Sequence, residues 1–109
     1  MKLIISVVQD KDVGRLLDSL VRRGYQTTKL ASTGGFLRQG NTTLLIGVPD
    51  DRVDDAVGII EQTCRSRTEI LSPVAAPSGP AEAYIPYPVE VRVGGATLFV
   101  LDVEQFRKV

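Results

Sequence analysis

Residues 3–24 read LIISVVQDKDVGRLLDSLVRRG, and this stretch carries the two patterns that decide the fold. Its first six residues are almost all apolar and rich in β-branched side chains, which predicts a central β-strand covered on both faces. Asp10 is the predicted N-cap of a helix, and Gly24 ends that helix as a left-handed cap. The apolar stripe of the helix consists of Val13, Leu16, Leu17, Leu20 and Val21.

The alternation of strands and helices continues to residue 64. The threonine-rich residues 26–32 and the aliphatic residues 42–48 predict a second and a third strand. Pro49 and the two aspartates after it mark the start of a second helix, because acidic residues are favourable near the positive end of the helix dipole. The apolar face of this helix ends at Cys64, which we expect to be a buried small hydrophobic residue.

A change of composition separates this part from the C-terminal part. Residues 72–88 contain five of the six prolines, which predicts a long irregular loop. Residues 89–93 alternate valine with charged residues, as a half-buried strand does. The Gly-Gly pair at 94–95 predicts a tight hairpin turn into a last strand at 96–101. A final helical turn is expected at 103–108.

This order of elements predicts one domain over residues 1–109 of the α+β class. It matches a ferredoxin-like βαββαβ sandwich with an extra C-terminal hairpin strand, in which both helices cover one face of the sheet. The other face would be left uncovered, and its strands are too apolar to face water. We therefore expect the chain to self-associate.

Composition excludes several classes of function. The 109 residues include 13 basic, 13 acidic and no histidine residues, so imidazole bases, His-bearing metal sites and Ser/His/Asp or Cys/His nucleophilic sites are excluded. The single cysteine forms neither an internal disulfide nor a thiolate zinc cluster, and the balanced charge argues against binding polymeric nucleic acid or an anionic membrane. The apolar run at 3–8 is too short for a signal peptide or a membrane span. We expect a non-enzymatic, soluble, cytoplasmic protein with no metal or cofactor.

The candidate binding residues lie between residues 26 and 47. The connection at 33–41 is longer than a normal hairpin loop, and its three glycines permit close backbone approach to a ligand. Phe36 suits stacking on a flat ring, and Asn41 has the donor–acceptor pair that reads an adenine edge. Nearby hydroxyls suit phosphate or sugar oxygens: Thr27, Thr28, Ser32, Thr33, Thr42 and Thr43. The same residue types are also ordinary strand and turn formers, which leaves a purely structural role open.

Several strings in register along the chain point to one family. They include VVQDKD at 7–12, TGGFLR at 33–38, GNTT at 40–43, YIPYPVEV at 84–91 and VGGAT at 93–97. With this combination the sequence resembles the PII-like cyclic-di-AMP receptor family of bacteria, relatives of the PII nitrogen regulators. The loop at 33–41 is similar to the short T-loop of that family, and the loop at 72–88 is similar to its long B-loop.

The resemblance implies a homotrimer with one cyclic di-AMP in each cleft between neighbouring subunits. In that site Phe36 would stack on adenine, Asn41 and the backbone of Gly47 would read the base edge, and Thr28 would contact phosphate. Lys108 would supply positive charge from the C-terminus. The full set of implied ligand-binding residues is Gln26, Thr27, Thr28, Gly35, Phe36, Leu37, Asn41, Gly47 and Lys108. The two loops would respond to the ligand and present a surface to an unidentified downstream protein.

The sequence departs from the family pattern at the second strand. Gln26 stands where many relatives carry arginine, and Thr27 stands where they carry alanine. Losing a cation near a diphosphate removes a charge-assisted hydrogen bond of roughly 1.5–3 kcal/mol. Affinity would fall by a factor on the order of 10–100, or preference would shift to another nucleotide.

Two further interpretations follow from the sequence. One is a PII-like sensor of another adenine nucleotide, ATP or ADP, which Gln26 favours. The other is an interaction module that needs no nucleotide and acts through the YIPYP stretch at 84–88.

Overall fold

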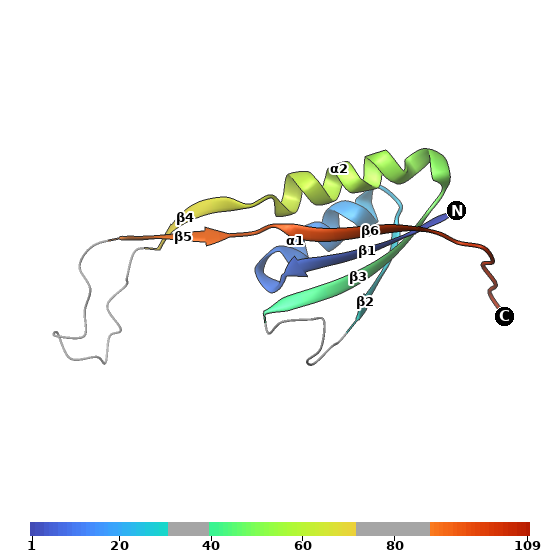
Figure 1. Ribbon diagram of the computed structural model, residues 1–109, viewed down its shortest axis with the longest axis horizontal. Helices are drawn as coiled ribbons and strands as arrows, with labels where there is room; N and C mark the ends of the chain where they lie inside the picture. Colours follow the sequence, from blue (N-terminus) through green and yellow to red (C-terminus); the bar gives the residue numbers. More distant parts are fainter. Residues whose placement is uncertain (31–39, 72–87) are drawn as a thin grey trace.

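The apolar strand near the start of the chain lies inside a four-stranded antiparallel sheet with the order β2-β3-β1-β6 (Figure 1). The structure is a computed structural model that describes residues 1–30, 40–71 and 88–109. Its elements are β1 (Lys2–Gln9), α1 (Asp10–Arg22), β2 (Gln26–Leu30), β3 (Asn41–Val48), the 3-10 turn η1 (Asp50–Arg52), α2 (Val53–Cys64), β4 (Arg67–Leu71), β5 (Val89–Val93) and β6 (Ala96–Asp102).

Helices α1 and α2 cover one face of this sheet, and the core lies between the two layers (Figure 1). Alternate residues of the central strands point into it, because side chains of a strand face opposite sides in turn. The buried apolar residues are Ile4, Val8, Val13, Leu16, Leu20, Tyr25, Leu44, Ile46, Val48, Ala56, Ile60 and Cys64. The predicted burial of Cys64 is confirmed.

The predictions for the first two-thirds of the chain agree closely with the structure, except that Val21, predicted in the apolar stripe of α1, is 65% exposed. Gly24 has a φ of 84°, the left-handed conformation expected at the end of α1. Asp10 is the first residue of α1 and not its N-cap, a position taken by Gln9. Asn41 is the first residue of β3, so the loop predicted at 33–41 ends one residue earlier.

The face of the sheet opposite the helices is called the open face. Directly paired residues of antiparallel strands point to the same side, so the register defines its members. They are Gln26, Thr28 and Leu30 of β2, Asn41, Thr43, Leu45 and Gly47 of β3, Leu3, Ile5, Val7 and Gln9 of β1, and Thr97, Phe99 and Leu101 of β6. Strand β1 is therefore covered by helices on one face only, and not on both as its apolar run predicts.

The predicted C-terminal hairpin is wrong. Strand β5 pairs with β4, which the sequence analysis did not assign, and β6 pairs with β1. The glycines between β5 and β6 have φ values of 84° and 94°, but their N–H groups bond to the body of the domain, at Gln9 Oε1 and the carbonyl of Cys64. The chain therefore continues from β5 into β6 without reversing (Figure 1).

The segment after β6 also differs from expectation. Residues 103–109 contain no helical turn, and the N–H of Val103 instead donates to the carbonyl of Met1 at 3.1 Å. Among the described elements, no helix has the length and apolar character needed to cross a membrane. Nearly all of the long proline-rich loop, residues 72–87, lies outside the described part of the chain.

Candidate functional site

Strand β2 carries three of the predicted site residues and separates them onto two faces. Gln26 pairs with Gly47, and Thr28 pairs with Leu45, so both lie on the open face. Thr27 pairs with the fully buried Ile46 and faces the helices. The structure thus brings Gln26, Thr28 and Gly47 together and places Thr27 on the other side of the strand.

Thr27 does not present its hydroxyl to the open face. Its Oγ1 atom is buried and has no hydrogen-bond partner among the described residues. An unpaired buried hydroxyl costs free energy, and alanine, which the family resemblance expects here, would not carry that cost. This placement gives Thr27 a packing role on the helix side of β2, and its contact with a ligand stays a prediction.

Asn41 lies at the other end of β3 from Gly47. Asn41 pairs with Gln9 of β1. It is six positions from Gly47 along β3, which corresponds to a separation of ~20 Å. The two residues predicted to read one base edge therefore do not converge within this chain. Asn41 instead lines a cavity of about 340 Å³ with Val7, Val8, Gln9, Gly94, Gly95, Ala96 and Thr97.

The start of β3 is held in place by its neighbours. Thr42 donates a hydrogen bond from Oγ1 to Asp10 Oδ1 at 2.5 Å, and the N–H of Asp10 donates to the carbonyl of Gly40 at 2.8 Å. These contacts connect the first residues of β3 to the first turn of α1. The backbone beside Asn41 is therefore supported by a rigid element.

Lys108 is exposed in the segment that follows β6. Strand β6 ends where β1 begins, since Leu101 pairs with Leu3. Gly47 pairs with Leu3, and Gln26 pairs with Gly47, so these residues lie side by side across the sheet. The segment that carries Lys108 therefore leaves the sheet at the same end as Gly47 and Gln26. Gly35, Phe36 and Leu37 lie outside the described residues.

The open face is electrically neutral over the described residues. Its members are apolar side chains, threonines, one glycine and the amides of Gln9, Gln26 and Asn41, with no acidic or basic side chain among them. Lys29, which stands between Thr28 and Leu30 on β2, pairs with the buried Leu44 and so points to the helix side of the strand. A ligand on this face would be bound by hydroxyl, amide and backbone groups and by apolar contact.

Comparison with known proteins identifies the family. The sequence model of the family described as "Cyclic-di-AMP receptor" matches residues 1–109. The chain belongs to the cyclic-di-AMP receptor family.

This receptor-family chain is similar to a GlnB-like protein in sequence and to a solved structure in fold. It is 38% identical over 76 residues to "Nitrogen fixation nifHD region GlnB-like protein 1" of Methanothermococcus thermolithotrophicus, a match that covers 58% of this chain and 72% of that protein. It is 41% identical to a functionally unknown protein of Pediococcus pentosaceus ATCC 25745, whose crystal structure matches with a TM-score of 0.79. That match covers 99% of this chain and 96% of the other.

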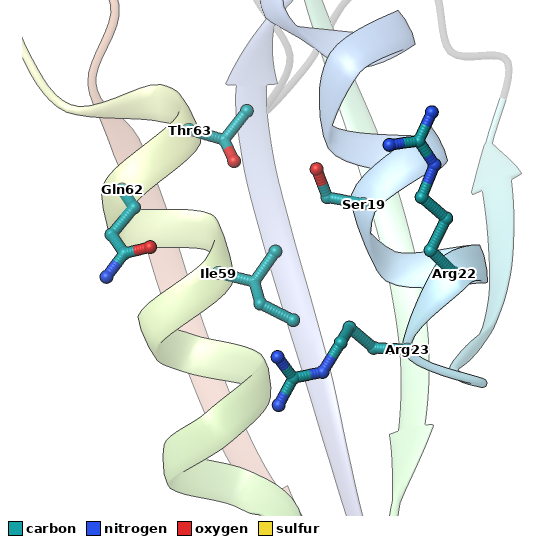
Figure 2. A pocket seen from close by; sticks show the side chains of 6 residues that line it. All are labelled: Ser19, Arg22, Arg23, Ile59, Gln62 and Thr63. Atoms are coloured by element: carbon teal, nitrogen blue, oxygen red, sulfur yellow. The ribbon is translucent and has the colours of Figure 1, made fainter.

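The receptor-family chain has a second hollow, which lies between the two helices (Figure 2). It has a volume of about 270 Å³ and is lined by Ser19, Arg22, Arg23, Ile59, Gln62 and Thr63. Arg23 donates to Asp55 at 2.6 Å, so its charge is already compensated. None of the residues predicted to bind a ligand lines this groove, which is on the helix side of the sheet.

An ion-pair network at the base of β4 was not found from the sequence. Asp12 in the first turn of α1 has a fully buried side chain, and its Oδ1 accepts from Arg67 at 2.9 Å and from Arg15 at 2.8 Å. The hydrogen bond from Arg67 is the largest cause that lowers the pKa of Asp12 below its usual value. Glu69 extends the network by pairing with Arg67 and with Lys11.

Cys64 is not a nucleophile in this arrangement. Burial raises the pKa of its thiol to about 11, so the reactive thiolate is scarce at neutral pH. Across the described residues, no group of three or more acidic or cysteine side chains is placed to hold a metal ion.

Proposed function

We propose that this member of the cyclic-di-AMP receptor family is a cytoplasmic, non-enzymatic signalling receptor that binds cyclic di-AMP without a resident cofactor. The ligand would occupy clefts between the subunits of a homotrimer and change loop conformation for a downstream protein. The observation that carries this proposal is the family match over residues 1–109. The neutral open face, with Gln26 and Thr28 beside Gly47, supports it because these residues offer hydroxyl, amide and backbone groups to a nucleotide.

A calorimetric titration tests the proposed function. Cyclic di-AMP is titrated into the protein, with cyclic di-GMP, ATP and cyclic AMP as comparisons. We expect saturable binding at micromolar or lower concentration for cyclic di-AMP alone. Heat from ATP but not from cyclic di-AMP would favour the second candidate, a PII-like sensor of another adenine nucleotide, for which the neutral Gln26 is the supporting observation. No heat with any nucleotide would refute both.

Asn41→Ala is expected to weaken binding of cyclic di-AMP. The amide of Asn41 lines a cavity and can pair with the two polar atoms of an adenine edge, an interaction of about 1–3 kcal/mol, or roughly 5–150-fold in Kd. The measurement is the same titration, with size-exclusion chromatography to check the assembly. The control is Gln62→Ala, which removes an exposed amide from α2. Equal affinities for both variants and the unmodified protein would place the base elsewhere.

The proposal of a trimer rests on the apolar character of the open face. Phe99 is 42% exposed and Leu101 is 47% exposed, and they pair with Ile5 and Leu3 on the neighbouring strand. An extended apolar surface of this kind is characteristic of an interface. Association through this face would remove it from water.

Leu101→Glu is expected to shift the protein from trimer to monomer. A carboxylate buried in an apolar interface without a partner costs several kcal/mol, which opposes association through this face. The mass in solution is measured by light scattering after size exclusion. Val21→Glu is the matched control, because Val21 is also exposed but lies on α1. A trimer that persists in Leu101→Glu, or dissociates equally in Val21→Glu, would contradict assembly through the open face.

A further inference from the structure

Strands β4 and β5 form a two-stranded arm that is separate from the main sheet. Figure 1 shows the arm extending from the end of the main sheet that lies away from both termini. It is attached to the body at its base. The N–H groups of Gly94 and Gly95 donate to Gln9 Oε1 and to the carbonyl of Cys64, and Arg67 pairs with Asp12. Glu69 of the arm also pairs with Lys11 of α1. Among the described residues, these contacts hold the base of the arm on the body.

The junction at Gly94 is closely packed against backbone. A Cβ atom at this position would lie 2.4 Å from the carbonyl oxygen of Arg65, and the φ of 84° also disfavours any other residue. The N–H of Gly94 donates to Gln9 Oε1 at 2.7 Å, a short and well-formed hydrogen bond. The Gln9 side chain of the main sheet thus holds the backbone at Gly94, where the arm joins the body of the domain.

Gln9 stands at the proposed ligand site as well as at the arm. It is the last residue of β1 and pairs directly with Asn41, the first residue of β3. Gln9, Asn41 and Gly94 line the same cavity of about 340 Å³. A base that reaches Asn41 from this cavity therefore meets the amide that holds the arm.

We propose that Gln9 is a positioning residue that couples a nucleotide base beside Asn41 to the seating of the arm. The inference rests on the proposed function. The carboxamide of glutamine is planar, with one oxygen that accepts and one nitrogen that donates. While Oε1 holds the N–H of Gly94, the Nε2 atom is fixed in direction and can donate to a ring nitrogen of adenine.

The coupling is reciprocal by thermodynamic necessity. The bond from Gly94 orients the amide before the ligand arrives, which lowers the entropy cost of binding. The ligand in turn restrains the amide and strengthens its hold on Gly94. Ligand binding therefore slows opening of the arm at its base.

Hydrogen exchange at the backbone amide of Gly94 tests this coupling, measured by NMR with and without cyclic di-AMP. Without ligand, we expect exchange to be about five- to tenfold faster in Gln9→Ala, because one hydrogen bond is lost. Gln9→Glu keeps an oxygen acceptor and should keep the protection of Gly94. With ligand, exchange should slow further in the unmodified protein and in the control Gln62→Ala, but not in Gln9→Glu, which lacks the Nε2 donor. Affinity should fall about five- to tenfold in both Gln9 variants.

The outcomes separate the coupling from the proposed function. Binding of cyclic di-AMP with no change in exchange at Gly94 would overturn the coupling and leave the function intact. Unchanged Gly94 exchange in ligand-free Gln9→Ala would also overturn it, because the anchor would then lie elsewhere. If the unmodified protein binds no cyclic di-AMP, the function and the coupling both fail, and only the anchoring role of Gln9 is measured.

Discussion

Arg67→Met is expected to destabilise the folded protein by about 3 kcal/mol at neutral pH. The Asp12 side chain is completely buried, and Arg67 donates to both of its carboxylate oxygens, at 2.9 and 3.4 Å. Methionine retains much of the aliphatic volume of arginine but carries no charge. Among the described residues, Arg15 is then the cation that still pairs with the buried carboxylate of Asp12. The free energy of unfolding is measured by urea denaturation at one fixed subunit concentration, because assembly contributes to stability.

The effect should depend on pH in a defined direction. Arg67 holds the pKa of Asp12 below its usual value, so the pair stabilises the fold above the ordinary carboxyl pKa of about 3.9 and loses this contribution as pH falls through the lowered value. In the variant the largest lowering cause is gone while burial, which raises the pKa, remains. The difference in stability between the two proteins should therefore shrink between about pH 7 and about pH 3.

The control for this substitution is Arg92→Met. Arg92 is an exposed arginine of the same arm, and its guanidinium donates to Ser66 at 3.1 Å. Exposed substitutions of this kind change stability by about 0.5 kcal/mol or less. Equal effects at Arg67 and Arg92, or an effect at Arg67 that is independent of pH, would contradict the role assigned to the buried pair.

Gln26→Arg is expected to tighten binding of cyclic di-AMP by about 10–100-fold. Gln26 is exposed on the edge strand β2, opposite Gly47, on a face without charged side chains among the described residues. An arginine there can donate a charge-assisted hydrogen bond to a phosphate of the ligand, worth roughly 1.5–3 kcal/mol. The gain should decrease as salt concentration rises, because exposed charges are screened.

The gain must be separated from a general effect of added positive charge. Gln62→Arg makes the same chemical change on the exposed face of α2, in the other layer of the domain. We expect its affinity for cyclic di-AMP to lie within about twofold of the unmodified protein, since a distant surface charge is largely screened. The two variants are compared by calorimetry at low and high salt. An equal gain from both, or no gain from Gln26→Arg, would place the phosphates away from β2.

The sequence by itself determined the elements whose signals are local. The apolar stripe of α1, the left-handed Gly24 and the burial of Cys64 follow from spacings of a few residues, which is the range over which helix periodicity and capping act. The alternation of side chains along β2 also places Thr28 and Lys29 on opposite faces, as the register confirms. The sequence motifs shared with the family indicated candidate ligand-binding residues. The structure places three of them close together on the same face of the sheet: Gln26, Thr28 and Gly47.

Only the tertiary structure decided the features that depend on partners far apart in the chain. Strand β4 is a short segment with two charged residues, and its partner β5 begins 18 residues after it ends. The glycine pair at 94–95 is a hairpin signal, but hydrogen bonds to Gln9 and Cys64 outweigh the local preference. Asp12 and Arg67 are 55 positions apart, and no local pattern pairs them. Burial against distant segments, which a window of sequence does not contain, selects these contacts.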